Sequence, residues 1–324
     1  MRHPNLRNNQ CIVLPASHKD TIMTNETQSH NTFKSGFIAI VGAPNVGKST
    51  LLNRMLGEKI SITSKKPQTT RNRIVGVVHR PLSQLIFIDT PGVHKAGKPL
   101  NVRIVEQALS ALGDVDAVLI MVDASAPDSE SEAILVKNLK MLKLPVILAL
   151  NKIDLIKKPI LLSLIDQWTG RYPFKAIIPV SARHGTQVDA ISEALEKLLP
   201  PGPPFFPEDA LTDMPERFIA GEMIREKVFR LTGQEIPYSI AVTVDSFKED
   251  SRKGLVRILA TIHVERDSQK GIIIGKKGGK LKQIGEAARK DIERLLGTKV
   301  FLELFVRIQK NWSKDTRALR RFGY

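Results

Sequence analysis

Residues Gly42 to Ser49 read GAPNVGKS, and this stretch decides the interpretation of the first half of the chain. It follows the apolar run Phe37 to Val41 and opens the amphipathic segment Thr50 to Leu56, so it predicts a glycine-bounded loop between a strand and a helix. In such a loop, backbone N–H groups surround phosphate oxygens, the lysine reaches the β- and γ-phosphates, and the final serine can bind Mg²⁺. We therefore expect a phosphate-binding loop (P-loop), although an ordinary glycine turn would have the same spacing.

Strands and helices are expected to alternate from Phe37 to about Leu199, because short apolar runs lie between segments of helical spacing. The expected strands are Phe37 to Val41, Ile74 to Val78, Leu85 to Ile88, Ala117 to Val122, Val146 to Leu150 and Ala176 to Val180. The expected helices are Thr50 to Leu56, Asn101 to Leu112, Glu130 to Leu142, Ile160 to Gly170 and Gln187 to Leu199. This order predicts an α/β P-loop NTPase fold, with helices on both faces of a mainly parallel sheet and the site on the loops at the strand ends.

Two motifs at later strand ends indicate which base is bound. Asn151-Lys152-Ile153-Asp154 ends one apolar run, and Ser181-Ala182-Arg183 ends the last. Asp154 can accept hydrogen bonds from N1–H and the exocyclic amine of guanine, whereas adenine would leave the carboxylate unpaired. The later motif is expected to place a backbone N–H near O6 of guanine. Each tetrapeptide alone is weak, but together they predict a guanine nucleotide, GTP or GDP.

Asp89-Thr90-Pro91-Gly92, at the end of Leu85 to Ile88, is expected to face the γ-phosphate. There Asp89 can hold Mg²⁺ through a water molecule, and the Gly92 N–H can contact the phosphate. Val93 stands where Ras-type enzymes have the glutamine that orients the attacking water, so slow intrinsic hydrolysis is expected. His94 is the nearest titratable side chain, and a solvated bystander is its simpler interpretation.

The polar segment Lys65 to Arg71 shows no helical or strand period. We interpret it as a switch loop in which Thr70, or else Thr69, supplies a second hydroxyl to Mg²⁺ when GTP is bound, with a plain basic loop as the alternative. The expected Mg²⁺ ligands are therefore Ser49, Thr70 and Asp89. No residue is assigned as catalytic with certainty, and the Thr70, Gly92 and Val93 region is expected to position water. The expected nucleotide-binding residues are Gly42, Ala43, Pro44, Asn45, Val46, Gly47, Lys48, Ser49, Asp89, Thr90, Pro91, Gly92, Val93, Asn151, Lys152, Ile153, Asp154, Ser181, Ala182 and Arg183.

The net charge of +16 over 324 residues is concentrated near the C-terminus. Residues 270 to 324 hold fifteen Lys and Arg against five Asp and Glu, whereas residues 201 to 269 hold nine against twelve. This distribution favours a polyanionic partner over general solubility, although a solvated basic face is the alternative. Cys11 is the only cysteine, which excludes a disulfide within one chain and suits a reducing cytoplasm. The longest apolar runs fall short of the roughly 18 residues of a spanning helix.

Composition divides the chain into five parts. Residues 1–34 are expected to be a disordered extension, part of which is dispensable or precedes a true start at Met23. Five prolines between Pro200 and Pro207 predict a domain boundary. We therefore expect a GTP-binding domain at 35–199, a linker at 200–208, a second domain at 209–310 and a basic tail at 311–324.

The second domain is expected to have the order α-β-β-α-α-β of a type II KH domain. The helix is Glu216 to Leu231, two strands join near 251–254, helical patterns cover Gly271 to Leu296, and the last strand is Val300 to Ile308. A GxxG turn between two helices lets the backbone approach single-stranded nucleic acid closely. A simple helix–helix turn fits GxxG as well. The expected RNA-binding residues are Gly275, Lys276, Lys277, Gly278, Lys280, Lys282, Arg317, Arg320 and Arg321, with Trp312, Phe322 and Tyr324 expected to stack on bases.

From about Gly36 to Tyr324 the chain resembles the Era family of bacterial GTPases. The resemblance rests on the motifs GAPNVGKS, QTTR, DTPG, NKID, SAR and IIIGKKGG and on the ending RALRRFGY. The resemblance implies a Ras-like domain coupled to a KH domain that grips the 3′ end of 16S ribosomal RNA and assists maturation of the 30S subunit. It implies a cytoplasmic monomer, with peripheral inner-membrane contact in some members. It also implies that Asn45 can hold K⁺ in place of an arginine finger, although loop packing explains Asn45 equally well. The family's N-termini are shorter than residues 1–34.

The predicted function is therefore that of a GTPase acting in ribosome assembly, and three alternatives are kept. The first is an RNA-binding module that holds GTP as a structural ligand without turnover, for which Val93 is the reason. The second is an assembly GTPase acting on another RNA. The third is a membrane-surface regulatory protein whose basic tail binds anionic lipid.

Overall fold

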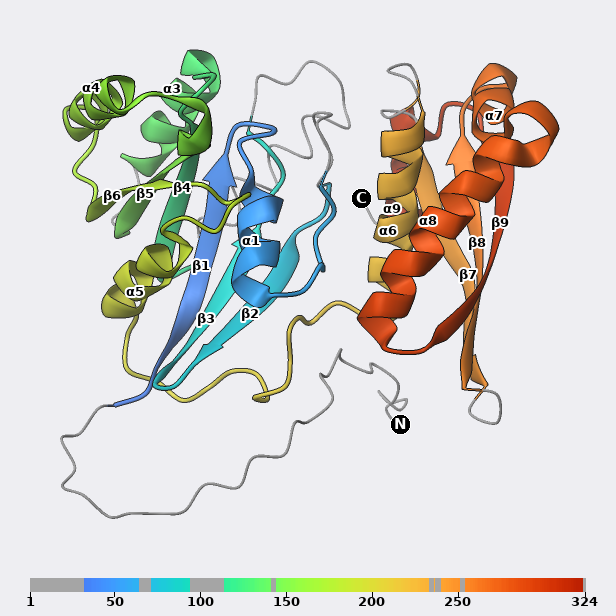
Figure 1. Ribbon diagram of the computed structural model, residues 1–324, viewed down its shortest axis with the longest axis horizontal. Helices are drawn as coiled ribbons and strands as arrows, with labels where there is room; N and C mark the ends of the chain where they lie inside the picture. The colour runs from blue at the N-terminus through green and yellow to red at the C-terminus, as the bar shows by residue number, and fades with distance from the viewer. Residues whose placement is uncertain are drawn as a thin grey trace, which may run out of the picture.

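The computed structural model describes residues 32–63, 71–93, 114–140, 144–232, 236, 240–250 and 254–322. These residues form two lobes, one around a six-stranded sheet and one around a three-stranded sheet (Figure 1). The expected helix 101–112 and residues 65–70 of the expected switch loop lie outside the described residues. Within them, no helix has the length and apolar character needed to cross a membrane.

The first sheet has the order β2-β3-β1-β4-β5-β6 and is parallel except for β2, which runs antiparallel to β3. Its strands are β1 (Lys34–Gly42), β2 (Ile74–Arg80), β3 (Ser83–Asp89), β4 (Ala117–Asp123), β5 (Val146–Asn151) and β6 (Ala176–Val180). Strands buried on both faces read as continuous apolar runs, as β4 and β5 do. Because the parallel strands end at one edge, the motifs that follow β1, β3, β5 and β6 meet there.

Helices cover both faces of this sheet. Ile38 and Ile40 pack in the same core as α1 (Lys48–Leu56) and α5 (Val188–Leu198), whereas the alternate residues Ala39 and Val41 pack with α3 (Ser129–Leu139) and α4 (Lys158–Thr169). The two-residue period of a strand thus divides β1 between two cores. The short 3₁₀-helix η1 (Ile153–Leu155) follows β5. The mainly parallel fold predicted from the sequence is confirmed.

The Pro-rich segment lies along the first sheet. Gly202 N donates to Phe33 O at 3.0 Å, and Oε1 of Gln84 accepts from the backbone N–H groups of Phe205 and Phe206. Further along, Val77 N donates to Leu211 O at 2.8 Å. Residues 202 to 211 are therefore fixed to β2 and β3, which sets the point from which the second lobe begins.

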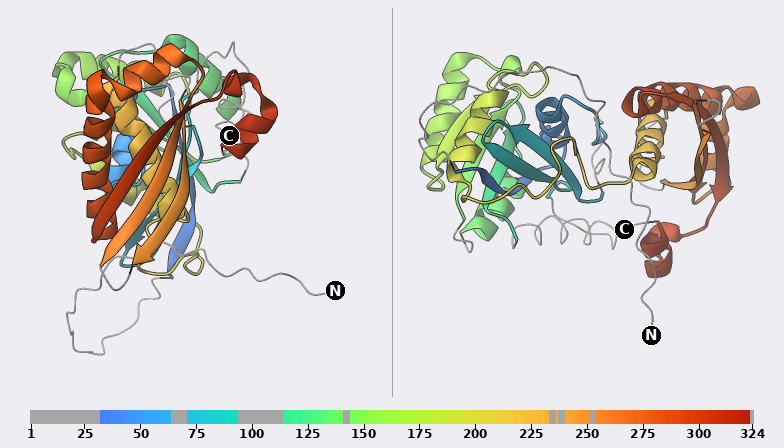
Figure 2. Two further views of the ribbon diagram at one scale, coloured as in Figure 1. Left: turned by 90° about the vertical axis from the view of Figure 1, so that its right-hand side faces the viewer. Right: turned by 90° about the horizontal axis from the view of Figure 1, so that it is seen from below.

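The second lobe packs three helices on one face of a sheet of order β7-β8-β9, in which β7 is antiparallel and β9 parallel to β8. Its elements are α6 (Glu216–Leu231), β7 (Ala241–Asp250), β8 (Leu255–Val264), α7 (Asp267–Ile274), η3 (Lys276–Gly278), α8 (Gly279–Leu296), β9 (Lys299–Ile308), η4 (Trp312–Lys314) and α9 (Thr316–Arg321). This is the predicted type II KH order. Figure 2 shows that α9 lies apart from the other helices, at the far edge of the sheet from α8.

Candidate functional site

The P-loop leaves β1 and ends where α1 begins. Gly47 has φ 105°, and a Cβ added there would lie 2.3 Å from Nδ2 of Asn151, so glycine is required by both conformation and space. Gly92 is similarly confined, because its Cβ would lie 2.7 Å from the backbone of Pro44. The P-loop is thus packed between the Asn151 and Asp89–Gly92 motifs.

Lys48 is buried inside the loop. Its Nζ donates to the carbonyls of Gly42 at 3.1 Å and Ala43 at 2.9 Å. Burial lowers the pKa of Lys48 to about 8, and nearby Asp89 only partly opposes this shift. A phosphate oxygen beside this amine would favour its charged form, so phosphate binding and protonation are linked at this residue.

Asp89 is fully buried and joins two hydroxyls. Its Oδ2 accepts from Oγ of Ser49 at 2.6 Å and from Oγ of Ser61 at 2.8 Å. Burial raises the pKa of Asp89, and its Oδ1 has no hydrogen-bond partner within the described chain. Hydroxyl and carboxylate oxygens are the donors Mg²⁺ prefers, and an unused buried carboxylate oxygen suits a cation. Ser49 and Asp89 therefore fit Mg²⁺, whereas Thr70 lies outside the described residues. No motif spacing marked Ser61.

The rest of this motif packs against the P-loop. Oγ1 of Thr90 donates to Ile40 O at 2.7 Å, and the N–H of Val93 donates to Gly42 O at 3.0 Å. Val93 is fully buried in the core with α3 and α4. An aliphatic side chain buried in this way cannot orient water by hydrogen bonding. His94 lies outside the described residues.

The guanine motifs are tied to each other through Asn151. Its Nδ2 donates to Val46 O at 2.7 Å, and its Oδ1 accepts from Ala182 N at 2.9 Å. The Ala182 N–H therefore joins two loops in this structure. Lys152, at φ 66°, forms an ion pair with Asp123, which in turn accepts from Ser125.

Asp154 is held ready as a hydrogen-bond acceptor. Oγ of Ser181 donates to its Oδ1 at 2.6 Å, and Nε2 of His184 lies 3.7 Å from Oδ2. The hydrogen bond from Ser181 is the main reason that the pKa of Asp154 is lowered. The carboxylate is ionised at neutral pH, as recognition of guanine requires.

A cavity of about 1020 Å³ joins these motifs to the second lobe. Its walls include the P-loop and both guanine motifs, a size and composition suited to a nucleotide. Thr63 and the α6 residues Phe229 and Arg230 complete it. Sequence reasoning missed these three, and it also missed Thr50 and Leu155. The lining residues are Asn45, Gly47, Thr50, Thr63, Asn151, Lys152, Asp154, Leu155, Ala182, Arg183, Phe229 and Arg230.

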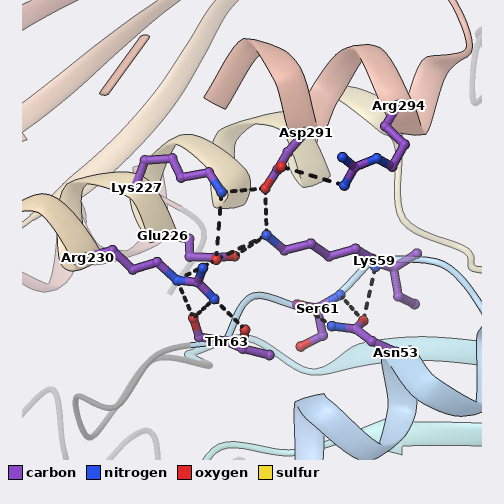
Figure 3. Close-up of polar contacts among 10 residues, drawn as sticks. Asn53, Lys59, Ser61, Thr63, Glu226, Lys227, Arg230, Asp291 and Arg294 are labelled. Carbon is purple, nitrogen blue, oxygen red and sulfur yellow. Dashed lines mark hydrogen bonds and ion pairs between the residues drawn. The ribbon is translucent and has the colours of Figure 1, made fainter. Parts of the chain in front are cut away.

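The lobes meet in a network of charges around Glu226, whose side chain is fully buried (Figure 3). Lys59 of the first lobe lies 2.8 Å from Glu226 and 2.7 Å from Asp291, and Arg230 lies 2.8 Å from Glu226. Lys227 also pairs with Asp291. Burial alone would raise the pKa of Asp291, but hydrogen bonds from Lys227 and Lys59 lower it.

One short loop contacts both this network and Asp89. Residues 57–63 follow α1, and Oδ1 of Asn53 fixes them by accepting from the N–H groups of Ile60 and Ser61 (Figure 3). Within the loop Lys59 contacts the second lobe, Ser61 contacts Asp89, and Thr63 accepts from Arg230 at 3.0 Å. A shift at Asp89 would therefore move residues that hold the second lobe.

Arg71, at the end of the predicted switch loop, also enters the second lobe. It is almost fully buried, and its Nη1 donates to Ile240 O at 2.7 Å. Its guanidinium carbon lies 5.9 Å from the ring centres of both Phe229 and Trp312. The expectation that Trp312 stacks on bases is wrong for this structure, because the ring is fully buried against Ala241 and α9. Phe322 packs on Trp312 at 5.2 Å, and Tyr324 lies outside the described residues.

The GxxG turn is η3, between α7 and α8. Gly275, Lys277 and Gly278 all have positive φ, and a Cβ at Gly275 would lie 2.6 Å from Cβ of Lys280. Lys276, Lys277 and Lys282 are exposed, whereas Lys280 is half-buried. Arg317 and Arg320 are exposed on α9, and the side chain of Arg321 lies outside the described set.

A groove of about 510 Å³ begins at this turn. Of the expected RNA-binding residues, Gly278 and Lys282 line it. Sequence reasoning missed the others, which come from α8 and the edge strand β9. They are Leu281, Gly285, Glu286, Arg289, Phe301, Leu302, Glu303 and Leu304.

Comparison with known proteins agrees with both sites. A family model described as a 50S ribosome-binding GTPase matches residues 37–152, and a KH domain model matches residues 235–313. GTPase Era of Geobacter metallireducens is 59% identical over 91% of this chain and 99% of its own length. GTPase Era of Syntrophus aciditrophicus is 52% identical over 90% of this chain and 95% of its own.

Two solved structures have the same overall fold. One is Era in complex with MgGDPNP and nucleotides 1506–1542 of 16S ribosomal RNA, at 43% identity and a TM-score of 0.86, over 90% of this chain and 99% of that one. The other is a variant of Era from Aquifex aeolicus bound to GDP and AlF₄⁻, at 42% identity with the same TM-score and coverage.

The pKa of Lys48 predicts a pH dependence of nucleotide binding. In the nucleotide-free protein Lys48 has a pKa of about 8, and the phosphates of a bound nucleotide would raise this pKa. The complex therefore binds more protons than the free protein. Affinity for GDP therefore falls as pH rises, by about fourfold between pH 7 and 8.5. Titration calorimetry in two buffers of different ionisation heat measures the proton uptake. Binding without proton uptake, at constant affinity over this range, would contradict the assignment.

Proposed function

Because the chain belongs to the GTPase Era family, we propose that it hydrolyses GTP as a switch that binds the 3′ end of 16S ribosomal RNA and acts in 30S subunit biogenesis. The observation that carries this proposal is the presence, in one chain, of a guanine-nucleotide cavity and a GxxG groove with exposed lysines. We propose the cytoplasm as its compartment, because ribosomal RNA is assembled into subunits there. An assembly GTPase acting on a different RNA remains the alternative.

The KH groove is proposed to hold single-stranded RNA. A GxxG turn clamps about four nucleotides, with its backbone close to theirs. Here Lys276 and Lys277 occupy the two central positions of the turn, and Lys282 continues the positive charge into α8. The solved relative contains nucleotides 1506–1542 of 16S ribosomal RNA, and that segment is the probe we choose.

Reversing the charge of the turn separates RNA binding from nucleotide binding. The double variant Lys276→Asp and Lys277→Asp should lose RNA affinity while GTP affinity stays unchanged. Single-stranded RNA contacts contribute a slope of about −0.7 each in log K against log salt, so about four contacts give roughly −3, and the variant should be clearly shallower. Lys157→Asp with Lys158→Asp, two exposed lysines of the first lobe, is the matched control. If the native protein and the Lys276→Asp, Lys277→Asp variant have equal salt slopes, the turn is only structural.

Turnover is proposed to be slow in the isolated protein, because Val93 supplies no polar group for the attacking water. We propose that K⁺ held at Asn45 accelerates it, as expected from the family resemblance. Single-turnover hydrolysis is measured in K⁺ and in Na⁺, with and without RNA. Asn45→Ala should remove the advantage of K⁺. If no condition releases phosphate, the alternative of GTP as a structural ligand is favoured instead.

We further propose that loop 57–63 transmits the nucleotide state to the KH domain. Support comes from the contacts of Ser61 with Asp89 and of Lys59 with Glu226 and Asp291. A ligand that moves Asp89 thereby changes the contacts that hold α6 and α8. The predicted switch, residues 65–71, follows this loop in the sequence.

Lys59→Ala should weaken this coupling. We expect GTP and GDP to differ in their effect on RNA affinity by about 5- to 150-fold in the native protein, the usual range of allosteric coupling. The variant should bring this ratio much closer to one with little change in GTP affinity, because Lys59 does not line the cavity. Lys158→Ala serves as the control, and RNA titrations with each nucleotide give the ratio. A ratio unaltered by Lys59→Ala would exclude this route.

Other expectations remain proposals. The domain limits 35–199, 200–208, 209–310 and 311–324 stay proposals. Strand β1 already begins at Lys34, inside the expected extension 1–34, and residues 202 to 211 pack on β2 and β3. We propose Mg²⁺ as the cofactor, held by Ser49 and Asp89. The monomeric state and peripheral contact with the inner membrane rest on the resemblance alone.

A further inference from the structure

Within the described residues, the outer face of the KH sheet, opposite α6 and α8, is largely uncovered (Figure 2, left). Alternate residues of β8, including Val256, Ile258 and Ala260, point into the core, so their neighbours face outward. The described part of the tail covers one end of this face, where the ring centre of Phe322 lies 4.6 Å from that of His263 and Trp312 packs on Ala241.

Two phenylalanines stand on the open part. Phe301 and Phe305 of β9 are each 48% exposed, a large fraction for aromatic side chains. Four residues along one strand span about 13 Å, so both rings lie on the same face but too far apart to pack on each other. Each ring can therefore accept a different planar partner.

The charged neighbours fit a nucleic-acid base better than a phosphate. The guanidinium carbon of Arg257, paired in register with Phe301, lies 5.7 Å from the centre of that ring. Glu303 lies between the two phenylalanines, where a carboxylate repels phosphate but accepts from an exocyclic amine. Among the described strand residues of this face, four cations and three anions nearly balance, so stacking rather than net charge would supply the affinity there. They are Lys248, Arg257, Lys299, Arg307, Asp245, Asp250 and Glu303.

The same strand borders the KH groove. Phe301 and Glu303 also line that groove, beside Gly278 and Lys282. At its other end β9 leads into the tail, which carries the exposed Arg320. A KH turn holds about four nucleotides, so a longer strand needs a surface beyond the groove. The outer side of β9 is continuous with it.

We propose that Phe301, Phe305 and Arg257, here called the β9 platform, form a second RNA site that stacks bases of the strand where it leaves the groove. This inference rests on the proposed RNA binding of the KH domain. Stacking on aromatic rings tolerates every base, because each has a π-face. The platform therefore increases the affinity for longer RNA strands without selecting their sequence.

Phe305→Ala tests the platform, because Phe305 does not line the groove. The probes are single-stranded pieces of nucleotides 1506–1542, one set of about 5 nucleotides that the groove alone accommodates and one set of about 15. The variant should bind the long RNA about 5- to 100-fold more weakly and the short RNA normally. The factor by which Phe305→Ala lowers the affinity for long RNA should not change with salt concentration. The factor for charge reversal at Lys276 and Lys277 should change with salt.

Two further variants make the result specific. Phe305→Trp should restore long-RNA affinity, and its added fluorescence should be quenched by long RNA but not by short RNA. Leu162→Ala, at an exposed apolar side chain of α4, should leave both affinities unchanged.

The outcomes separate this inference from the proposed function. If the native protein binds neither RNA, the proposed function fails and the platform with it. If it binds both and Phe305→Ala changes neither, or changes both equally, the platform alone is overturned. A native dimer that Phe305→Ala converts to monomer in sedimentation would also overturn it, because a second copy would then occupy this face.

Discussion

The arrangement of the nucleotide site depends on the hydrogen bonds that the buried carboxylate of Asp89 accepts. A buried charge is unfavourable unless polar groups surround it, and here the hydroxyls of Ser49 and Ser61 meet on one of its oxygens. Ser49 lies in the first turn of α1, Ser61 lies in the loop that follows α1, and Asp89 ends β3. The burial of one side chain thus fixes both ends of the first helix relative to the sheet, and it leaves the other carboxylate oxygen available to a cation.

A second buried carboxylate, Glu226, organises the contact between the domains. Removing a partner from a buried ion pair leaves an uncompensated charge, which costs about 3–5 kcal/mol when the site is fully shielded. Lys59 and Arg230 are partly exposed, so the cost here is smaller, yet Glu226 itself has no access to water. Both carboxylates contact loop 57–63, Asp89 through Ser61 and Glu226 through Lys59. One short segment therefore links the nucleotide site to the contact between the domains, which is the physical basis of the proposed coupling.

The RNA-binding side follows from a different constraint. A three-stranded sheet with helices on only one face leaves the other face to solvent, a partner or a further segment of the chain. The tail covers part of that face, where Trp312 is buried. Along β9, exposed aromatic and charged residues alternate with more buried residues that face the core. The edge strand thereby borders the groove on one side and the open face on the other.

The sequence by itself determined the elements and the positions of the motifs. Apolar periodicity and glycine placement are local signals, and they correctly gave the alternating first domain, the type II KH order and the meeting of the motifs at one edge of the sheet. Only the tertiary structure revealed Ser61, Thr63, Arg230 and the network around Glu226, and it corrected the role of Trp312. Lys59 and Asp291 are 232 residues apart in the chain, and no local pattern records which distant charges will be buried together. Burial is a property of the packed chain, so the partners of a buried group are decided only when the two domains meet.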